Sequence, residues 1–372
     1  MSTWRDQYDL QYQVDQIVNK QDAEVRDDGL PAPFSLATVF KEPPPLAPPL
    51  IHGVLRQGHK MVLSGPSKAG KSFALMYLCF AIAEGFTWFG NKCEQGKVLY
   101  INMEIDKRSC INRFKKIYDK KRKNTDGHPE NIEIWSLRGH AQPISQLADK
   151  IIETAKQDYK AIVIDPLYKI LEGDENSNSD ISKMVCNFDR ITEATGASVI
   201  YAHHFAKGIS GDKDVIDRAA GAGTFARDPD AIVTMTQIDT EGAHGETAWR
   251  VEFVLREFPN KDPYDVWFIY PTHEYTEDLK DKSIVTRETR KGKNAEAASK
   301  QKKDKQSDDI EGVIDNIKDA DGKFVFSRFY NRYKFVDDVS DQTARNRLKA
   351  LGYEPDKNCP PGGTPYWFKK DN

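Results

Sequence analysis

The chain has 372 residues, of which 39% are hydrophobic and 30% are charged, and its formal net charge is -3 at pH 7. This length favours two domains, and a charged share above the usual ~25% is typical of a polar globular protein rather than a fibrous one. The longest apolar run, residues 73–83, is far shorter than the ~20 residues that cross a bilayer, which excludes a membrane protein.

The N-terminal segment and the cysteines favour a cytoplasmic protein. The first ten residues, MSTWRDQYDL, contain no apolar stretch of the kind that a secretory signal has. The five cysteines show no CxxC or Cys/His spacing, which argues against a disulfide framework and a zinc site. Residues 1–47 lead into a proline-rich stretch that cannot continue a helix, and we interpret them as an N-terminal arm.

Residues 48–275 alternate between short apolar runs and helical stretches. The runs are KMVLSG (60–65), KVLYINME (97–104), NIEIWSL (131–137), KAIVIDP (160–166), ASVIYAHH (197–204), DAIVTMT (230–236) and WRVEFVL (249–255). Strands that alternate with helices predict an α/β domain with a mostly parallel sheet covered on both faces. The strands beyond about Ile232 follow one another without helices, so we expect them to form an antiparallel extension.

An octapeptide between the first apolar run and a long apolar helix matches the phosphate-loop pattern G-x-x-x-x-G-K-[ST]. It consists of Gly65, Pro66, Ser67, Lys68, Ala69, Gly70, Lys71 and Ser72. Glycines let backbone amides approach a polyphosphate, and the N-terminus of the helix adds further donors and a favourable dipole. We therefore predict a site for ATP and Mg²⁺, with Lys71 on the β and γ phosphates and Ser72 on the metal ion.

Three further runs end in polar residues that suit the same site. Asp165 ends an apolar strand in the Walker B manner, which would place it near the metal ion. Glu104 follows another strand and could polarise the attacking water, although an acid at a helix start is the alternative. His203 and His204 end a third strand and could sense the γ-phosphate, or they could simply be packed or exposed residues. As a pair, they are two ligands short of a zinc site.

The C-terminal part of the chain predicts a basic linker and a second small domain. Residues 286–305 hold eight Lys or Arg against three Asp or Glu and no aromatic residue, and we interpret 276–305 as a solvated linker. In residues 306–372 we expect a helix, a short strand, two helices and a β-hairpin, which is the order of a winged helix. Ser340 would begin the last helix and Gly352 would end it.

Residues 48–271 resemble the RecA-fold ATPases of the RepA type, which are hexameric helicases of plasmids and mobile elements. The resemblance is carried by the phosphate loop, the strands that end at Glu104 and Asp165, the phrase HHFAKG (203–208) and the glycine-rich segment 221–223. It implies a RecA-like P-loop fold and ATP hydrolysis at the subunit interfaces of a homo-oligomeric ring. It also implies single-stranded DNA in a central channel.

The resemblance further implies an arginine that reaches the site of a neighbouring subunit. The family pattern is altered here, so Arg218, Arg227 and Arg256 all remain candidates, with Arg227 and Arg256 preferred; each could instead form an ordinary ion pair. The loops expected at the channel give a mixed signal. Residues 171–180 are acidic and repel phosphates, and only Lys207 and Lys213 offer attraction.

The last helix of the C-terminal domain carries Arg345, Arg347 and Lys349, which would suit duplex DNA phosphates, with protein contacts as the alternative. Our primary hypothesis is an ATP-driven DNA helicase or translocase in the replication of a mobile element or phage. The alternatives are a RecA-like recombination or repair ATPase, and an ATP-gated winged-helix regulator that binds one duplex site.

Overall fold

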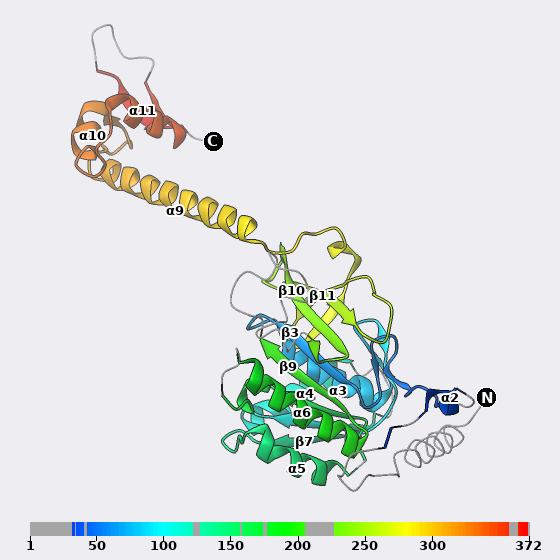
Figure 1. The fold of residues 1–372 in the computed structure, drawn as a ribbon. Coiled ribbons are helices and arrows are strands. Elements are labelled where there is room, and N and C mark those ends of the chain that lie inside the picture. The colour runs from blue at the N-terminus through cyan, green and yellow to red at the C-terminus, as the bar shows by residue number, and fades with distance from the viewer. Residues whose placement is uncertain are drawn as a thin grey trace. The chain divides into compact units, whose positions relative to one another are not determined.

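A computed structural model describes residues 32–33, 35–40, 43–121, 127–156, 158–173, 177–204, 227–356 and 364–370. The chain divides into two compact units, Met1–Thr286 and Arg287–Asn372 (Figure 1). Each unit has its own hydrophobic core. The predicted boundaries at residues 48, 276 and 306 stay a prediction.

In the described part of unit 1, nine strands form one sheet in the order β13-β12-β11-β10-β3-β9-β8-β6-β7. The parallel strands are β3 (Lys60–Gly65), β6 (Val98–Asn102), β7 (Ile132–Ser136), β8 (Ala161–Asp165), β9 (Ser198–His204) and β10 (Ala231–Glu241). The antiparallel extension consists of β11 (Thr247–Leu255), β12 (Tyr264–Ile269) and β13 (Thr272–Tyr275). The predicted fold class, a RecA-like α/β domain with a mostly parallel sheet, is confirmed.

Helices cover both faces of this sheet because its strands are apolar on both sides. The helices are α3 (Lys71–Glu84), α4 (Lys107–Lys121), α5 (Ile144–Ala155) and α6 (Asn178–Thr195). Successive residues of β6 show the division: Val98 and Tyr100 join a core with α3 and α4, whereas Leu99 and Ile101 join a core with α5 and α6. Burial on both faces explains why strands of this kind read as continuous apolar runs.

Several short elements complete unit 1. They are α2 (Leu36–Val39), β1 (Pro49–Ile51), β2 (Leu55–Arg56), β4 (Thr87–Trp88), β5 (Asn91–Lys92), η1 (Pro129–Asn131), η2 (Leu167–Lys169) and η4 (Glu277–Leu279). The sequence predicts neither of the small hairpins β1-β2 and β4-β5, because strands of two or three residues are too short for a period to be visible.

Unit 2 consists of α9 (Arg287–Asp315), β14 (Phe324–Val325), α10 (Phe326–Tyr333), α11 (Asp341–Ala350), β15 (Tyr353–Pro355) and β16 (Tyr366–Lys369). This is the predicted order of elements, and the strands form a sheet in the order β14-β16-β15. The side chain of Ser340 accepts a hydrogen bond from the amide of Thr343 at 3.2 Å, so Ser340 begins α11 as predicted.

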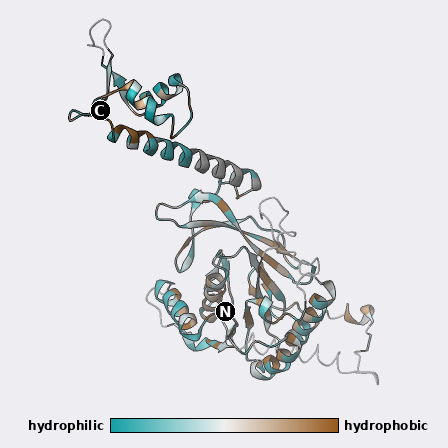
Figure 2. Cartoon of the chain, turned by 90° about the vertical axis from the view of Figure 1, so that its left-hand side faces the viewer, coloured by the Kyte–Doolittle hydropathy of each residue, from teal (hydrophilic) through white to brown (hydrophobic). Residues whose placement is uncertain are grey.

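Helix α9 begins at Arg287, well inside the segment that we interpret as a linker. That segment is therefore helical from Arg287 onward, in keeping with its many Lys, Gln, Glu and Ala residues. Figure 2 shows that the hydrophobic residues of α9 gather toward its C-terminal end, where Ile310 and Ile314 enter the core of unit 2. Among the described residues, no helix combines the length and apolar character needed to cross a membrane.

Candidate nucleotide-binding site

The phosphate loop connects β3 to α3, as the sequence predicts. Lys68 and Gly70 have φ angles of 68° and 78°, which turn the chain sharply before the helix. A Cβ atom on Gly70 would lie 3.0 Å from the ring of His273, so the position requires glycine for its backbone and for its space. The first amides of α3 consequently face the loop, where they can donate to an anion.

Lys71 is almost fully buried, with 7% of its surface exposed. Its Nζ donates to the carbonyl oxygens of Gly65 at 2.7 Å and Pro66 at 3.0 Å, and lies 3.1 Å from Nδ1 of His204. Burial lowers the pKa of the ammonium group to about 8, an effect that the nearby charges of Asp165 and Glu104 partly offset. This cation lies in a dry position at the carboxyl edge of the sheet, as a polyphosphate ligand requires.

Asp165 ends β8 and is 4% exposed. Burial raises the pKa of its carboxyl group, whereas hydrogen bonds from Tyr100 and Ser72 and the charge of Lys71 oppose that rise. The predicted metal ligands Ser72 and Asp165 are thus brought into hydrogen-bond contact. Their hydroxyl and carboxylate oxygens are hard donors that suit Mg²⁺, which commonly takes its remaining ligands from water and phosphate. No group of three or more His, Cys, Asp or Glu able to hold a metal occurs in the described residues.

Glu104 lies in the exposed turn that follows β6. Its charge acts on both Lys71 and Asp165, so it belongs to the same edge of the sheet. The side chain of Asn102 holds this turn: its Oδ1 accepts from the amide of Ile105 at 3.0 Å, and its Nδ2 donates to the carbonyl of Ile105 at 2.6 Å. An exposed carboxylate beside a dry cation and a metal-binding pair can reach a water molecule at a bound phosphate.

The two histidines end β9, directly beside β3. Ser64 pairs with His203 and Gly65 with His204, so both imidazoles lie next to the beginning of the phosphate loop. His203 is 4% exposed, and burial lowers its pKa to about 4, with a smaller contribution from the charge of His204. His204 contacts Lys71, as described above. The phrase that continues with Phe205, and the glycine-rich segment 221–223, lie outside the described residues.

The candidate arginines lie at the opposite edge of the sheet. Arg256 follows β11, whose last residue pairs with Ala231 at the start of β10, and Ala231 in turn pairs with Met61 near the start of β3. The Arg256 guanidinium contacts Asp230 at 3.0 Å and donates to the carbonyl oxygen of Arg227 at 2.6 Å. Arg227 and Arg256 therefore lie together, away from Lys71 of their own chain. Arg218, Lys207 and Lys213 fall outside the described residues.

Three residues of the site escape the sequence analysis: Tyr100, Asn102 and His273. Tyr100 and Asn102 are the alternate polar residues of an otherwise apolar strand, which is the signal that could have revealed them. His273 lies on β13, far along the chain, and its Nε2 donates to the carbonyl oxygen of Ala69 at 3.3 Å. Burial lowers the pKa of His273 to about 4, so its imidazole is neutral at neutral pH.

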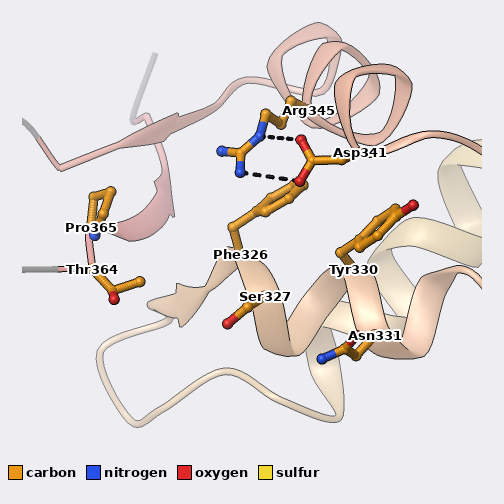
Figure 3. A pocket seen from close by; sticks show the side chains of 8 residues that line it. All are labelled: Phe326, Ser327, Tyr330, Asn331, Asp341, Arg345, Thr364 and Pro365. Carbon is orange, nitrogen blue, oxygen red and sulfur yellow. Dashed lines mark hydrogen bonds and ion pairs between the residues drawn. The ribbon is translucent and has the colours of Figure 1, made fainter.

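In unit 2, the three cations of α11 have different surroundings. Arg345 pairs with Asp341 of its own helix and lies 3.6 Å from the centre of the Phe326 ring, on one wall of a cavity of about 200 Å³ (Figure 3). Arg347 points into the unit, where it donates to Tyr333 and Asp337 at 2.8 and 2.6 Å. Arg347 is thus not available to DNA phosphates as the sequence suggests. Lys349 is exposed.

Taken together, the sheet order, the phosphate loop and the acidic strand ends define unit 1 as a RecA-like P-loop ATPase domain. Residues 28–209, just under half of the chain, match the family model described as AAA domain. The match supports an ATPase. Among solved structures, the chain is similar to the ATPase domain of a phage helicase, at 14% identity and a TM-score of 0.46, over 65% of this chain and 97% of that one. No curated protein matches the chain.

Proposed function

We propose that this chain is an ATP-hydrolysing DNA helicase or translocase of the RepA type, which works as a homo-oligomeric, hexameric ring in the replication of a mobile element or phage. The observation that carries the proposal is the convergence of Lys71, Asp165, Glu104 and His204 beside the phosphate loop. A phosphate loop alone binds nucleotide, whereas a loop with a metal-binding acid and a second carboxylate has the parts for hydrolysis.

Each group has one role in this proposal. The loop amides and Lys71 bind the phosphates, Ser72 and Asp165 would hold Mg²⁺, and Glu104 orients the attacking water and accepts its proton. Bound Mg²⁺ would neutralise charge on the β and γ phosphates. His204 contacts Lys71 and lies on the strand that leads toward residue 205, so it would respond to the γ-phosphate.

The proposed partner of unit 1 is single-stranded DNA, and the test is ATP turnover by the full chain with and without it. We expect turnover to rise with single-stranded DNA and a forked duplex to be separated. Lys71→Ala should abolish nucleotide binding, whereas Lys150→Ala on α5 should leave it unchanged. ATP turnover that is indifferent to DNA contradicts the motor and favours another ATP-driven role.

We also propose that unit 2 is a winged-helix domain that contacts duplex DNA through α11. Its exposed face presents Gln342, Asn346 and Lys349, which are one turn apart along the helix. Side-chain amides pair with adenine edges in the major groove, so this face suits base contacts better than an array of charges. Asn346→Ala should weaken binding to a selected duplex by about tenfold, and Gln301→Ala on α9 should not; equal binding by both variants would exclude α11.

A further inference from the structure

Strand β6 carries two polar side chains that are wholly buried. Tyr100 and Asn102 are both 0% exposed, and they stand two residues apart, on the same face of the strand. Burying a hydroxyl or an amide is costly unless each polar atom has a hydrogen-bond partner. The partners of these two residues therefore show what the strand is organised to hold.

Tyr100 reaches across to the neighbouring strand β8. Its hydroxyl donates to Oδ2 of Asp165 at 2.6 Å, and its ring packs edge-on against Phe114 of α4 at a centroid distance of 5.1 Å. Phe114 restricts the ring, and the hydrogen bond restricts rotation of the carboxylate. The amide of Met103 also donates to the carbonyl oxygen of Asp165 at 3.0 Å, which keeps β6 and β8 together to their ends.

Asn102 acts on the other carboxylate, through the backbone. Besides its two hydrogen bonds to Ile105, its Nδ2 donates to Oγ of Ser136 at 3.2 Å, on the neighbouring strand β7. Just beyond Ile105, the side chain of Asp106 accepts from the amides of Arg108 and Ser109 and so begins α4. The turn that carries Glu104 is thus fixed on both sides, although Glu104 itself is exposed.

We propose that Tyr100 and Asn102 are positioning residues with separate tasks: Tyr100 orients the Asp165 carboxylate for Mg²⁺, and Asn102 orients the turn that presents Glu104 to the attacking water. The proposal rests on the proposed function, because it assigns the two carboxylates to metal binding and to hydrolysis. It predicts that loss of one hydrogen bond impairs one of these steps and spares the other.

The first test is Tyr100→Phe, which removes one oxygen atom and keeps the ring. A fluorescent ATP analogue is titrated with Mg²⁺, and we expect the Mg²⁺ concentration for half-maximal binding to rise about tenfold or more. Nucleotide binding without Mg²⁺ should not change. At saturating Mg²⁺ the turnover number should return toward the wild-type value.

The matched control is Tyr159→Phe. Tyr159 is also buried and donates to a carboxylate, Glu133, at 2.6 Å, but it lies before the start of β8, at the edge of the sheet away from the phosphate loop. We expect it to leave the Mg²⁺ dependence unchanged. An unchanged Mg²⁺ dependence in Tyr100→Phe overturns its assignment. So does failure of Tyr100→Phe to fold where Tyr159→Phe folds, because the hydroxyl would then be a requirement of the fold.

The second test is Asn102→Ala. Mg²⁺-dependent nucleotide binding should stay at the wild-type level, and the turnover number should fall about tenfold at every Mg²⁺ concentration. Ser136→Ala removes one of the three hydrogen bonds from the β7 side, and it should give a smaller loss of the same kind. Asn131→Ala, which removes a bond to the carbonyl of Ala83 before the start of β7, is the control and should be neutral.

The outcomes separate this inference from the proposed function. If Asn102→Ala and Ser136→Ala both turn over ATP like the wild type, the assignment of Asn102 is wrong while the ATPase stands. If the wild type binds Mg²⁺ and ATP without hydrolysing it, the proposed function falls and the Asn102 half falls with it. The Tyr100 half is still decided by the binding titration.

Discussion

At the scale of single residues, Lys71 and Asp165 share one electrostatic problem. Burial disfavours the charged form of both groups, and each lowers that cost for the other. In the chain without nucleotide, the ammonium group of Lys71 is held by two loop carbonyls and by His204. A phosphate oxygen that replaces these partners meets a cation that is already desolvated and positioned, so little reorganisation is needed on binding.

The role of Glu104 gives a direct prediction. Glu104→Gln keeps the shape of the side chain and removes its ability to accept a proton, so ATP should still bind while the turnover number falls by about 100-fold or more. Binding of a fluorescent ATP analogue and phosphate release measure the two properties separately. Glu153→Gln on α5 is the control. Equal turnover in Glu104→Gln and the wild type would remove Glu104 from the catalytic residues.

His273 predicts how stability depends on pH. Its pKa is about 4 in the folded chain and 6.5 ordinarily, so the unfolded chain binds a proton between these values that the folded chain does not. The free energy of unfolding should therefore decrease as the pH falls from 6.5 toward 4. At 1.36 kcal/mol per pKa unit, His273 contributes a loss of about 2 to 3 kcal/mol by pH 4.5.

Urea unfolding of His273→Gln at pH 7.5 and pH 4.5 checks this sign. Glutamine can still donate to the carbonyl of Ala69 but does not titrate, so the variant should lose less stability on acidification than the wild type. His203, whose pKa is also about 4, acts equally in both proteins. His244→Gln, at an exposed position of unit 1, should behave like the wild type. The same acid-induced loss in all three proteins would contradict the assignment.

At the scale of elements, the junction between the phosphate loop and α3 depends on the antiparallel extension. His273 of β13 and Phe268 of β12 lie 3.0 and 3.2 Å from the position of a Cβ atom on Gly70. The extension is therefore the wall against which the loop closes, and not a mere continuation of the sheet. It comes late in the chain, so the loop is complete only when β12 and β13 have joined the sheet.

Two glycine variants test this wall. Gly70→Ala combines an unfavourable φ of 78° with the two close contacts, whereas Gly139→Ala has a φ of 81° and nothing within 4 Å. Gly139→Ala should lower the free energy of unfolding by about 1 kcal/mol, and Gly70→Ala by about 2 to 3 kcal/mol. Gly70→Ala should also weaken nucleotide binding. Urea unfolding and titration measure both, and equal effects of the two variants would contradict a steric role of β12 and β13.

Elements with strong periodic or apolar patterns could be predicted from the sequence, and contacts between distant segments could not. The runs ending at Glu104 and Asp165 are strands because β-branched and apolar residues suit a sheet that is buried on both faces. The contact of His273 with Ala69 joins residues 204 positions apart, and no local pattern encodes it. Likewise, spacing alone places Arg347 on α11 but cannot tell that it points toward Tyr333.

At the scale of the whole molecule, the two edges of the sheet in unit 1 hold complementary groups. Lys71, Asp165 and Glu104 lie at the carboxyl edge, and Arg256 and Arg227 lie at the amino edge. In a ring of identical subunits joined head to tail, one edge of each subunit can meet the other edge of its neighbour. The arginine that the proposed site lacks could then come from the next copy, while Asp230 holds Arg256 in place in its own chain.

Mixing two inactive variants tests such a shared site. Lys71→Ala lacks the cation of the phosphate loop, and Arg256→Ala lacks the candidate arginine, so neither should hydrolyse ATP alone. In an equimolar mixed ring, the interfaces that join an intact Lys71 to an intact Arg256 should restore about a quarter of the wild-type turnover. The same mixture with Arg227→Ala tells which arginine crosses the interface, because only the correct partner gives recovery. Turnover by Arg256→Ala and Arg227→Ala alone at the wild-type rate would show that neither arginine completes a neighbouring site.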